Sequence, residues 1–347
     1  MGVYRIVGKK LVPEADFRQL GDGKVIPAQP ELAQAGGITP FVPVGVGKPL
    51  TIKIRHVYTG SYPKRRAFGG SKDVAVVSGV KDYSVFAATT RALNFIQRGH
   101  TAHTAIRTPS AFTEGTSIIA YFPSLTAESL TLSLELAVDD FPQEFVDKVG
   151  TAFRSLGGIP LLLPHAGYLL AAGEIIRLAG SLGNGLFDGK PEFEFTVPLN
   201  FDSPGDLVVN ADFRLLANSE TLRLEYEYDN ERGMVHRQTQ KVYDGDDPYV
   251  VISLDGRVRP DLAEFAPTAA SASVLKGFFN MGEDVSIRID TLVEGIRLLS
   301  DMRFRNKALE ITKALEHLPA DSPDRARLQQ QYDAFVKNIA NDLFKPA

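Results

Sequence analysis

Two histidines and a set of carboxylates are the residues of this chain whose types and spacing could perform catalysis. His100 and His103 lie three residues apart in the segment RGHTAHTA, a helical spacing that could bring both imidazoles to one metal ion if a third ligand approached. With a carboxylate from a separate segment, such as Asp139, they would form the site of a hydrolase. The alternative interpretation is a solvated, polar helix end, and the other four histidines lie in unrelated contexts. We therefore expect no metal site.

Other catalytic signatures are missing from the 347 residues. The chain has no Cys, which excludes disulfides, thiolate metal sites and a cysteine nucleophile. Neither the phosphate-binding pattern G-x-x-x-x-G-K-[ST] nor the nucleophile pattern G-x-S-x-G occurs. Adjacent acids such as Asp139-Asp140 border predicted strands, where such residues usually bond to the backbone of a turn. We expect no cofactor, and the sequence favours a protein without catalytic activity.

Basic residues cluster between positions 53 and 81, with aromatic residues among them. If they share one face, Lys64, Arg65 and Arg66 could bind an anionic membrane surface or an acidic protein partner. A solvated loop over residues 60–70 is the alternative. The 38 basic and 42 acidic residues give a net charge of −4, so we expect no nucleic-acid partner. The cluster comprises Lys53, Arg55, Lys64, Arg65, Arg66, Lys72 and Lys81.

The most apolar part of the chain is the segment 156–187. Prolines and glycines divide it into pieces too short for a transmembrane helix. One interpretation is a buried helix at 166–182 that packs on a sheet. The other is a membrane-active effector in which residues 161–187, including Leu169 and Ile176, enter a bilayer after a conformational change.

Alternating hydrophobicity predicts the scaffold that must position these residues. The clearest example is residues 130–138, where five apolar side chains alternate with Thr131, Ser133, Glu135 and Ala137. Because a regular alternation of strands and helices is missing, we expect a mainly β (α+β) fold built on an antiparallel eight-stranded β-sandwich. The predicted strands are residues 50–58, 74–80, 117–122, 130–138, 193–199, 207–216, 222–228 and 248–254.

Helical spacing interrupts this pattern at 84–97 and 142–187, which we interpret as insertions into a sandwich domain of residues 50–266. Residues 1–49, rich in Pro and Gly, form an extended N-terminal arm in this prediction. Residues 267–347 form a C-terminal helical hairpin. Its first helix has an apolar stripe that includes Met302 and Leu309, and its second starts at Ser322-Pro323, a favourable N-cap and first-turn pair.

Two stretches resemble the C-two family of calcium- and lipid-binding β-sandwiches. They are residues 50–58 followed by Lys72-Asp73-Val74-Ala75-Val76-Val77, and residues 222–228 followed by Asp247-Pro248-Tyr249-Val250-Val251-Ile252. In that family a strand leads through a loop into an Asp-Pro-Tyr-Val strand, and acidic loops at one rim bind calcium. The resemblance implies an eight-stranded sandwich. Lys241 occupies the place of an expected aspartate, so the resemblance implies no calcium site.

These observations predict a non-catalytic interaction or assembly protein that acts through protein–protein or membrane-surface contacts. Its expected partner is another protein or a second copy of the chain, with an anionic membrane surface as a further candidate. The start of the chain, MGVYRIVGKKL, is interrupted by Lys9 and Lys10, so we expect no secretory signal and a cytoplasmic location. The hydrolase and the membrane-active effector remain the alternatives.

Overall fold

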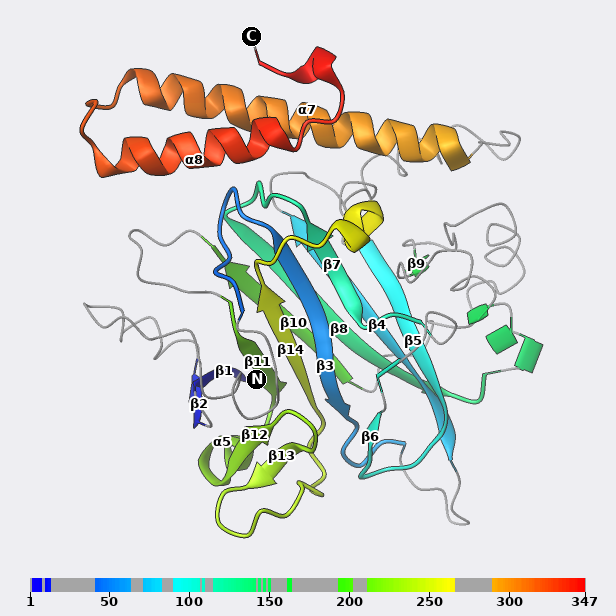
Figure 1. The fold of residues 1–347 in the computed structure, drawn as a ribbon. Helices are drawn as coiled ribbons and strands as arrows, with labels where there is room; N and C mark the ends of the chain where they lie inside the picture. The colour runs from blue at the N-terminus through cyan, green and yellow to red at the C-terminus, as the bar shows by residue number, and fades with distance from the viewer. Residues whose placement is uncertain are drawn as a thin grey trace.

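In the computed structural model of the chain, two antiparallel β-sheets lie face to face and a helical hairpin lies across one end of them (Figure 1). The predicted mainly β fold with a C-terminal helical hairpin is therefore confirmed. The structure describes residues 2–7, 10–13, 41–63, 71–82, 90–106, 108–109, 115–141, 143–144, 146–147, 149–150, 161–163, 193–201, 211–265 and 289–346.

The first sheet has seven strands and combines the start of the chain with its middle and late parts. Strand β14 lies between β11 and β3, so it joins two groups of strands that are otherwise not hydrogen-bonded to each other. In order across the sheet, the strands are β2 (Lys10–Pro13), β1 (Gly2–Val7), β11 (Phe213–Ala217), β14 (Tyr249–Asp255) and β3 (Leu50–Tyr58), with β6 (Ala105–Ile106) and β7 (Ile118–Phe122) both pairing with β3.

The second sheet has five strands, so the two sheets together exceed the predicted eight. The alternating residues of 130–138 behave as predicted, because Leu130, Leu132, Leu134 and Leu136 are buried between the sheets. They pack against Ile52 and other apolar side chains of the first sheet. In order, the strands are β10 (Phe193–Asn200), β8 (Ser129–Asp139), β4 (Lys72–Asp82), β5 (Thr90–His100) and β9 (Leu161–Leu163).

The helix predicted at 84–97 is wrong, because the residues from Thr90 onward form β5. Leu93 and Phe95 are both buried although they lie two apart, as in a strand. Hydrogen bonding to β4 and packing in the core therefore favour a strand here, although a few apolar residues have the spacing of a helix. Between Leu93 and Phe95, the extra residue Asn94 has no partner on β4 and forms a β-bulge.

The side chain of Asn94 connects the two sheets inside the core. Its Nδ2 donates to the carbonyl oxygens of Thr116 (3.3 Å) and Ile118 (3.1 Å), at the start of β7, and its Oδ1 accepts the hydroxyl of Ser78 at 2.5 Å. The backbone amide of Thr116 also donates to the carbonyl oxygen of Asn94. Because of the bulge, the polar side chain of Asn94 forms hydrogen bonds that link β5 to the opposite sheet.

The strand predicted at 222–228 is wrong in its first half. Residues Glu220–Glu225 form helix α5, and only Tyr226–Asp229 is a strand, β12. Leu222 is buried while Leu224 is exposed, so the two do not share a face as the alternation predicted. The guanidinium of Arg237 donates to three carbonyl oxygens at the end of α5, which stabilises the helix from outside its own sequence. These oxygens belong to Arg223, Leu224 and Tyr226, at 2.9–3.0 Å.

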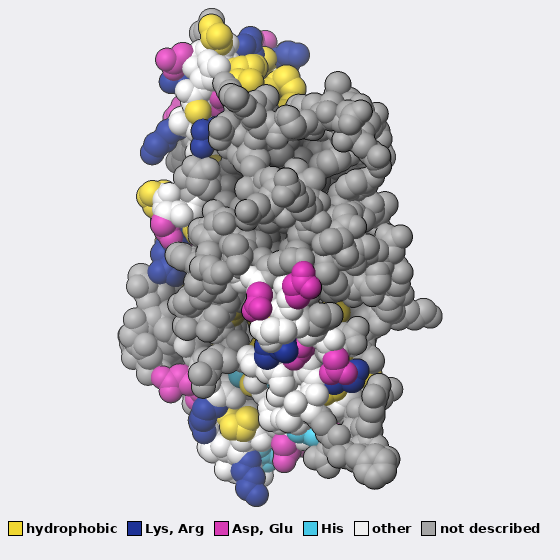
Figure 2. Space-filling view, turned by 90° about the vertical axis from the view of Figure 1, so that its right-hand side faces the viewer, with side chains coloured by type: hydrophobic (Ala, Val, Ile, Leu, Met, Phe, Trp, Pro, Cys, Tyr) yellow, Lys and Arg dark blue, Asp and Glu magenta, His cyan; other side chains and the backbone are white. Residues whose placement is uncertain are grey.

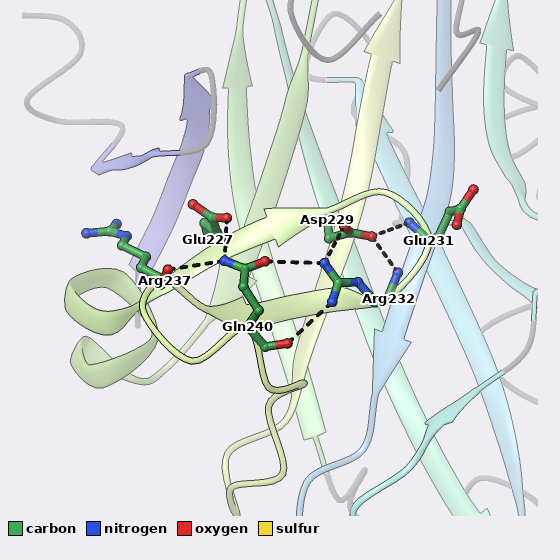
Figure 3. Close-up of polar contacts among 6 residues, drawn as sticks. All are labelled: Glu227, Asp229, Glu231, Arg232, Arg237 and Gln240. Atoms are coloured by element: carbon green, nitrogen blue, oxygen red, sulfur yellow. Dashed lines mark hydrogen bonds and ion pairs between the residues drawn. The ribbon is translucent and has the colours of Figure 1, made fainter. Parts of the chain in front are cut away.

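Strand β12 pairs with β13 (Gly233–His236) in a hairpin that covers the outer face of the seven-stranded sheet. A polar network lies on its surface (Figure 3). Arg232 donates to Asp229 (3.0 Å) and to the carbonyl oxygen of Gln240 (3.3 Å), while Gln240 Nε2 donates to Glu227 (3.2 Å). These bonds fasten the loop after β13 onto the hairpin.

Beneath the hairpin, His56 stacks on Tyr249, with ring centroids 5.6 Å apart. Gly233, at φ +81°, lies so close that a Cβ there would approach the His56 ring to 2.5 Å. Burial lowers the pKa of His56 from 6.5 to about 4, so the folded protein holds this imidazole neutral.

This shift predicts a pH-dependent contribution to stability. As the pH falls, the imidazole of His56 is protonated in the unfolded state before it is protonated in the folded state. The stability that the neutral imidazole contributes is therefore present above pH 6.5 and is lost as the pH falls toward 4. His56→Phe, which keeps the ring stacking, should therefore reduce the loss of unfolding free energy between pH 7 and pH 4.5 by about 2 kcal/mol. Urea unfolding of both proteins at the two pH values measures this; equal losses would contradict it.

Parts of the predicted arm and insertion also differ from expectation. Residues 2–7 and 10–13 of the arm form β1 and β2 of the seven-stranded sheet. The described residues between 143 and 150 are helical, as predicted for the start of the insertion, but Leu161–Leu163 forms β9 at the edge beside β5. The rest of the segment to residue 187, including Leu169 and Ile176, lies outside the described residues.

The helical hairpin consists of α7 (Ile289–Glu316) and α8 (Pro323–Lys337), and a short turn follows at η4 (Asp342–Phe344). Its own core includes Phe304 and Phe335, whose rings are 6.1 Å apart. A further short helix, η3 (Pro260–Phe265), packs through Leu262 on β7. The carboxylate of Asp301 on α7 accepts the backbone amides of Ala340 and Asn341 at 2.9 Å each, which fixes the chain after α8.

Candidate functional site

A cavity of about 590 Å³ lies beside the end of β5. Residues 95–101 line one side of it, and the helical residues Val146, Val149 and Gly150 line another. His100, the first of the predicted catalytic residues, is among the lining residues. A hydrolase site that contains His100 would therefore lie in this cavity.

His100 is buried, and its Nε2 lies 2.8 Å from Thr59 Oγ1 and 3.5 Å from Thr104 Oγ1. The Thr104 hydroxyl donates to the carbonyl oxygen of Thr101 at 2.6 Å, and the Thr59 hydroxyl donates to that of Thr104 at 3.4 Å. With both hydroxyl hydrogens used, we assign the proton of the imidazole to Nε2, which donates to the two oxygens. Burial lowers the pKa of His100, which keeps the ring neutral. His100 thus closes the turn at 101–104.

The side chain of His103 contacts different residues from those that His100 contacts. Its φ is +59°, and its Nε2 lies 3.6 Å from Asp246 Oδ1 while Nδ1 lies 3.4 Å from the carbonyl oxygen of Gly245. Asp139 lies on β8, opposite Asp73, with β4 between it and β5, and its side chain lies outside the described residues. Among the described contacts, the structure does not bring these three predicted residues into one proton-transfer chain.

Two ion pairs involve Arg98, which lines the cavity, and Lys72, which lies opposite His100 in the pairing of β4 with β5. Arg98 Nε lies 3.1 Å from Asp73 Oδ2, and the other oxygen of this carboxylate accepts the backbone amide of Gly99 at 2.9 Å. Lys72 and Asp140 form a second pair at 3.6 Å. Figure 2 shows basic and acidic side chains mixed over the described part of this side of the molecule. Arg98, the charged side chain among the described lining residues, is therefore already paired with a carboxylate.

Most of the predicted binding residues lie outside the described part of the chain. These are Lys64, Arg65 and Arg66 of the basic cluster, together with Leu169 and Ile176 of the apolar segment. Within the described residues, no three His, Asp or Glu side chains are grouped so that they could hold a metal ion. None of the described helices has both the length and the apolarity needed to cross a membrane.

The helical hairpin offers a second candidate site. On the described part of α7, the buried apolar residues are Phe304, Ala308, Ile311 and Leu315, which face α8. The predicted stripe is therefore wrong at Met302 and Leu309, which lie on another side of the helix and are 42% and 38% exposed. Leu298, four residues before Met302, is exposed on the same side. The spacing of Phe304, Ala308, Ile311 and Leu315 was the signal that could have identified the buried face.

Among the residues that the structure describes, the hairpin makes a narrow connection to the sandwich. Gln331 on α8 donates to the carbonyl oxygen of Val46 at 3.3 Å, and Val46 packs on the core of the hairpin. Gly47, at φ +81°, approaches Gln331 so closely that a Cβ would lie 2.9 Å from its side chain. Comparison with known proteins adds no further information. No family model, curated protein or solved structure matches the chain.

Proposed function

We propose that this protein is a non-catalytic assembly protein whose copies associate through the outer side of α7. The observation that carries the proposal is the row of exposed apolar side chains on this helix: Leu298, Met302 and Leu309. The hairpin does not need these side chains for its own core, which lies on the side facing α8. Exposed apolar side chains in a row are typical of a surface that another protein covers.

A second copy of α7 is a suitable occupant because of the shape of the hairpin. Helix α7 has 28 residues and α8 has 15, and Asp301 of α7 already contacts the residues that follow α8. The part of α7 before Asp301 therefore extends beyond its partner helix. Spacings of four and seven residues between the exposed side chains suit side-by-side helix packing, in which a symmetric dimer uses the same surface twice.

The alternatives have less support from the described contacts. To act in a hydrolase, His100 would need a carboxylate partner and an Nε2 free to contact the substrate, whereas its Nε2 is hydrogen-bonded to Thr59 Oγ1. For the membrane-active effector, the first described residues of its segment, Leu161–Leu163, pair with β5. Both functions remain predictions of the sequence.

The proposal predicts that charges on the outer side of α7 abolish association. In Met302→Glu/Leu309→Glu, two carboxylates would have to be buried, so we expect the mass in solution to fall from a multiple of 37.9 kDa to that of one chain. Light scattering coupled to size-exclusion chromatography over a hundredfold range of concentration measures the mass.

Ala314→Glu is the matched control. Ala314 is also exposed on α7, but it lies five residues after Leu309 and therefore about 140° around the helix. This variant should keep the mass of the unmodified protein. A single-chain mass for the unmodified protein at every concentration would reject the proposal, as would an unchanged mass in the double variant.

A further inference from the structure

A cluster of positive charge lies on the outer face of the seven-stranded sheet. Ile52 and Ile54 of β3 point into the core between the sheets, so Thr51, Lys53 and Arg55 point to the opposite face. Lys53 lies beside Ser253 of β14 in the ladder. We call Thr51, Lys53, Arg55 and Ser253 the Lys53 patch.

Lys53 has no anionic partner among the residues that the structure describes. Within the described part of the chain, its ammonium makes neither an ion pair nor a side-chain hydrogen bond. Burial lowers the pKa of Lys53, and three neighbouring guanidinium groups lower it further. These groups belong to Arg55, Arg257 and Arg259. A half-buried lysine among arginines is unfavourable unless an anion is bound nearby.

Two of the neighbouring arginines are already neutralised. Arg257 Nε lies 2.5 Å from Asp255 Oδ2, and Arg259 forms two bonds with Asp261, at 2.9 and 2.6 Å. Asp255 also accepts the backbone amide of Val42 at 3.1 Å. After these pairs are formed, Lys53 and Arg55 leave two positive charges without a paired carboxylate among the described residues.

Arg55 is held in a fixed position. Its guanidinium carbon lies 5.8 Å from the centre of the Phe41 ring and 5.7 Å from that of Phe213, in cation–π contact with both. Its Nε donates to Ser253 Oγ at 2.7 Å. The two terminal nitrogens have no described hydrogen-bond acceptor, so this side chain is ordered before any ligand binds.

Buried hydroxyl groups complete the patch. Thr51 Oγ1 is buried and has no hydrogen-bond partner. Ser253 is also buried, and because its oxygen accepts a bond from Arg55, its own hydrogen remains to be donated. An unpaired buried hydroxyl is costly, and an acceptor oxygen on a ligand would remove that cost.

We propose that the Lys53 patch binds a doubly charged oxyanion of the phosphate type. The ammonium of Lys53 and the terminal nitrogens of Arg55 match its two charges, and the hydroxyls of Thr51 and Ser253 supply neutral donors to its oxygens. The ligand is a free phosphate compound or the phosphomonoester headgroup of a lipid, since both present the same group. This inference is independent of the association through α7.

Titration calorimetry with inorganic phosphate tests the site, at constant ionic strength maintained with chloride. The 347-residue chain should bind one phosphate. Lys53→Met should weaken binding at least tenfold, because it removes one of the two unpaired charges. Thr51→Val, which keeps all charges, should weaken it about threefold to tenfold. Lys307→Met removes a partly exposed charge that is paired with Glu310 on α7, and it should bind phosphate as the unmodified protein does.

Thermal unfolding and vesicle sedimentation complete the test. Phosphate should raise the Tm of the unmodified protein and leave that of Lys53→Met unchanged. If the unmodified protein sediments with vesicles that contain phosphatidic acid, and Lys53→Met or excess phosphate abolishes this sedimentation, the ligand is a lipid headgroup. If the protein binds phosphate but does not sediment with the vesicles, the ligand is a free compound. No saturable phosphate binding, or equal affinities for Lys53→Met and Lys307→Met, would overturn the proposal.

Discussion

Asn94→Asp is expected to destabilise the sandwich by about 3–5 kcal/mol at pH 7. Asn94 is fully buried, and the Ser78 hydroxyl fixes the orientation of its amide so that Nδ2 faces the carbonyl oxygens of Thr116 and Ile118. A carboxylate in the same place would put a negative charge against two acceptors. Because the chain has no Trp, urea unfolding followed by far-ultraviolet circular dichroism is the suitable measurement.

Asn218→Asp is the control for this change in charge. Asn218 is exposed before α5, so the same substitution should change the free energy of unfolding by less than about 0.5 kcal/mol. Ser78→Ala should have an intermediate effect of about 1–3 kcal/mol, since it leaves Asn94 Oδ1 without its donor. Equal stabilities of Asn94→Asp and Asn218→Asp would show that the bridge between the sheets is not stabilising.

Phe335→Ala is expected to remove about 3–5 kcal/mol from the stability of the helical hairpin. Phe335 is fully buried and stacks on Phe304, and the core of the hairpin is small. Because the described contacts between the hairpin and the sandwich lie near Val46, we expect α7 and α8 to unfold while the sheets persist. Circular dichroism should show loss of helix, and hydrogen exchange should increase in 289–346 alone.

Leu343→Ala is the matched control, because Leu343 is 83% exposed at the end of the same unit. It should leave both helix content and exchange rates unchanged. If Phe335→Ala instead unfolded the sheets together with the helices, the hairpin and the sandwich would be one cooperative unit, contrary to the narrow connection.

Elements that depend on local pattern could be predicted from the sequence. The alternating apolar residues of 130–138 place one face of the strand in the core, whichever strand it pairs with. The helix that begins after Ser322 is marked by the N-cap and first-turn residues of its own sequence. The failures at 84–97 and 222–228 have distant causes. Hydrogen bonds with β4 hold the residues from Thr90 onward in a strand, and Arg237 stabilises the end of α5.

The candidate sites were less predictable than the fold, because side-chain partners come from separate parts of the chain. The spacing of His100 and His103 contains no information about Thr59 or Asp246. Lys53 and Arg55 were part of the predicted basic cluster, but alternation alone could not place Ser253 beside them. That neighbour follows from the pairing of β3 with β14, which are about 200 residues apart.

The central position of β14 also affects the order in which the chain can fold during synthesis. Strands β1 and β3 leave the ribosome early, yet the strand that joins their two groups ends at Asp255. Until that strand emerges, both groups have unpaired edges that could bind other nascent chains. Closure of the sheet therefore waits until Asp255 has been translated, and a chain that terminates before Tyr249 would lack the strand that completes the sheet.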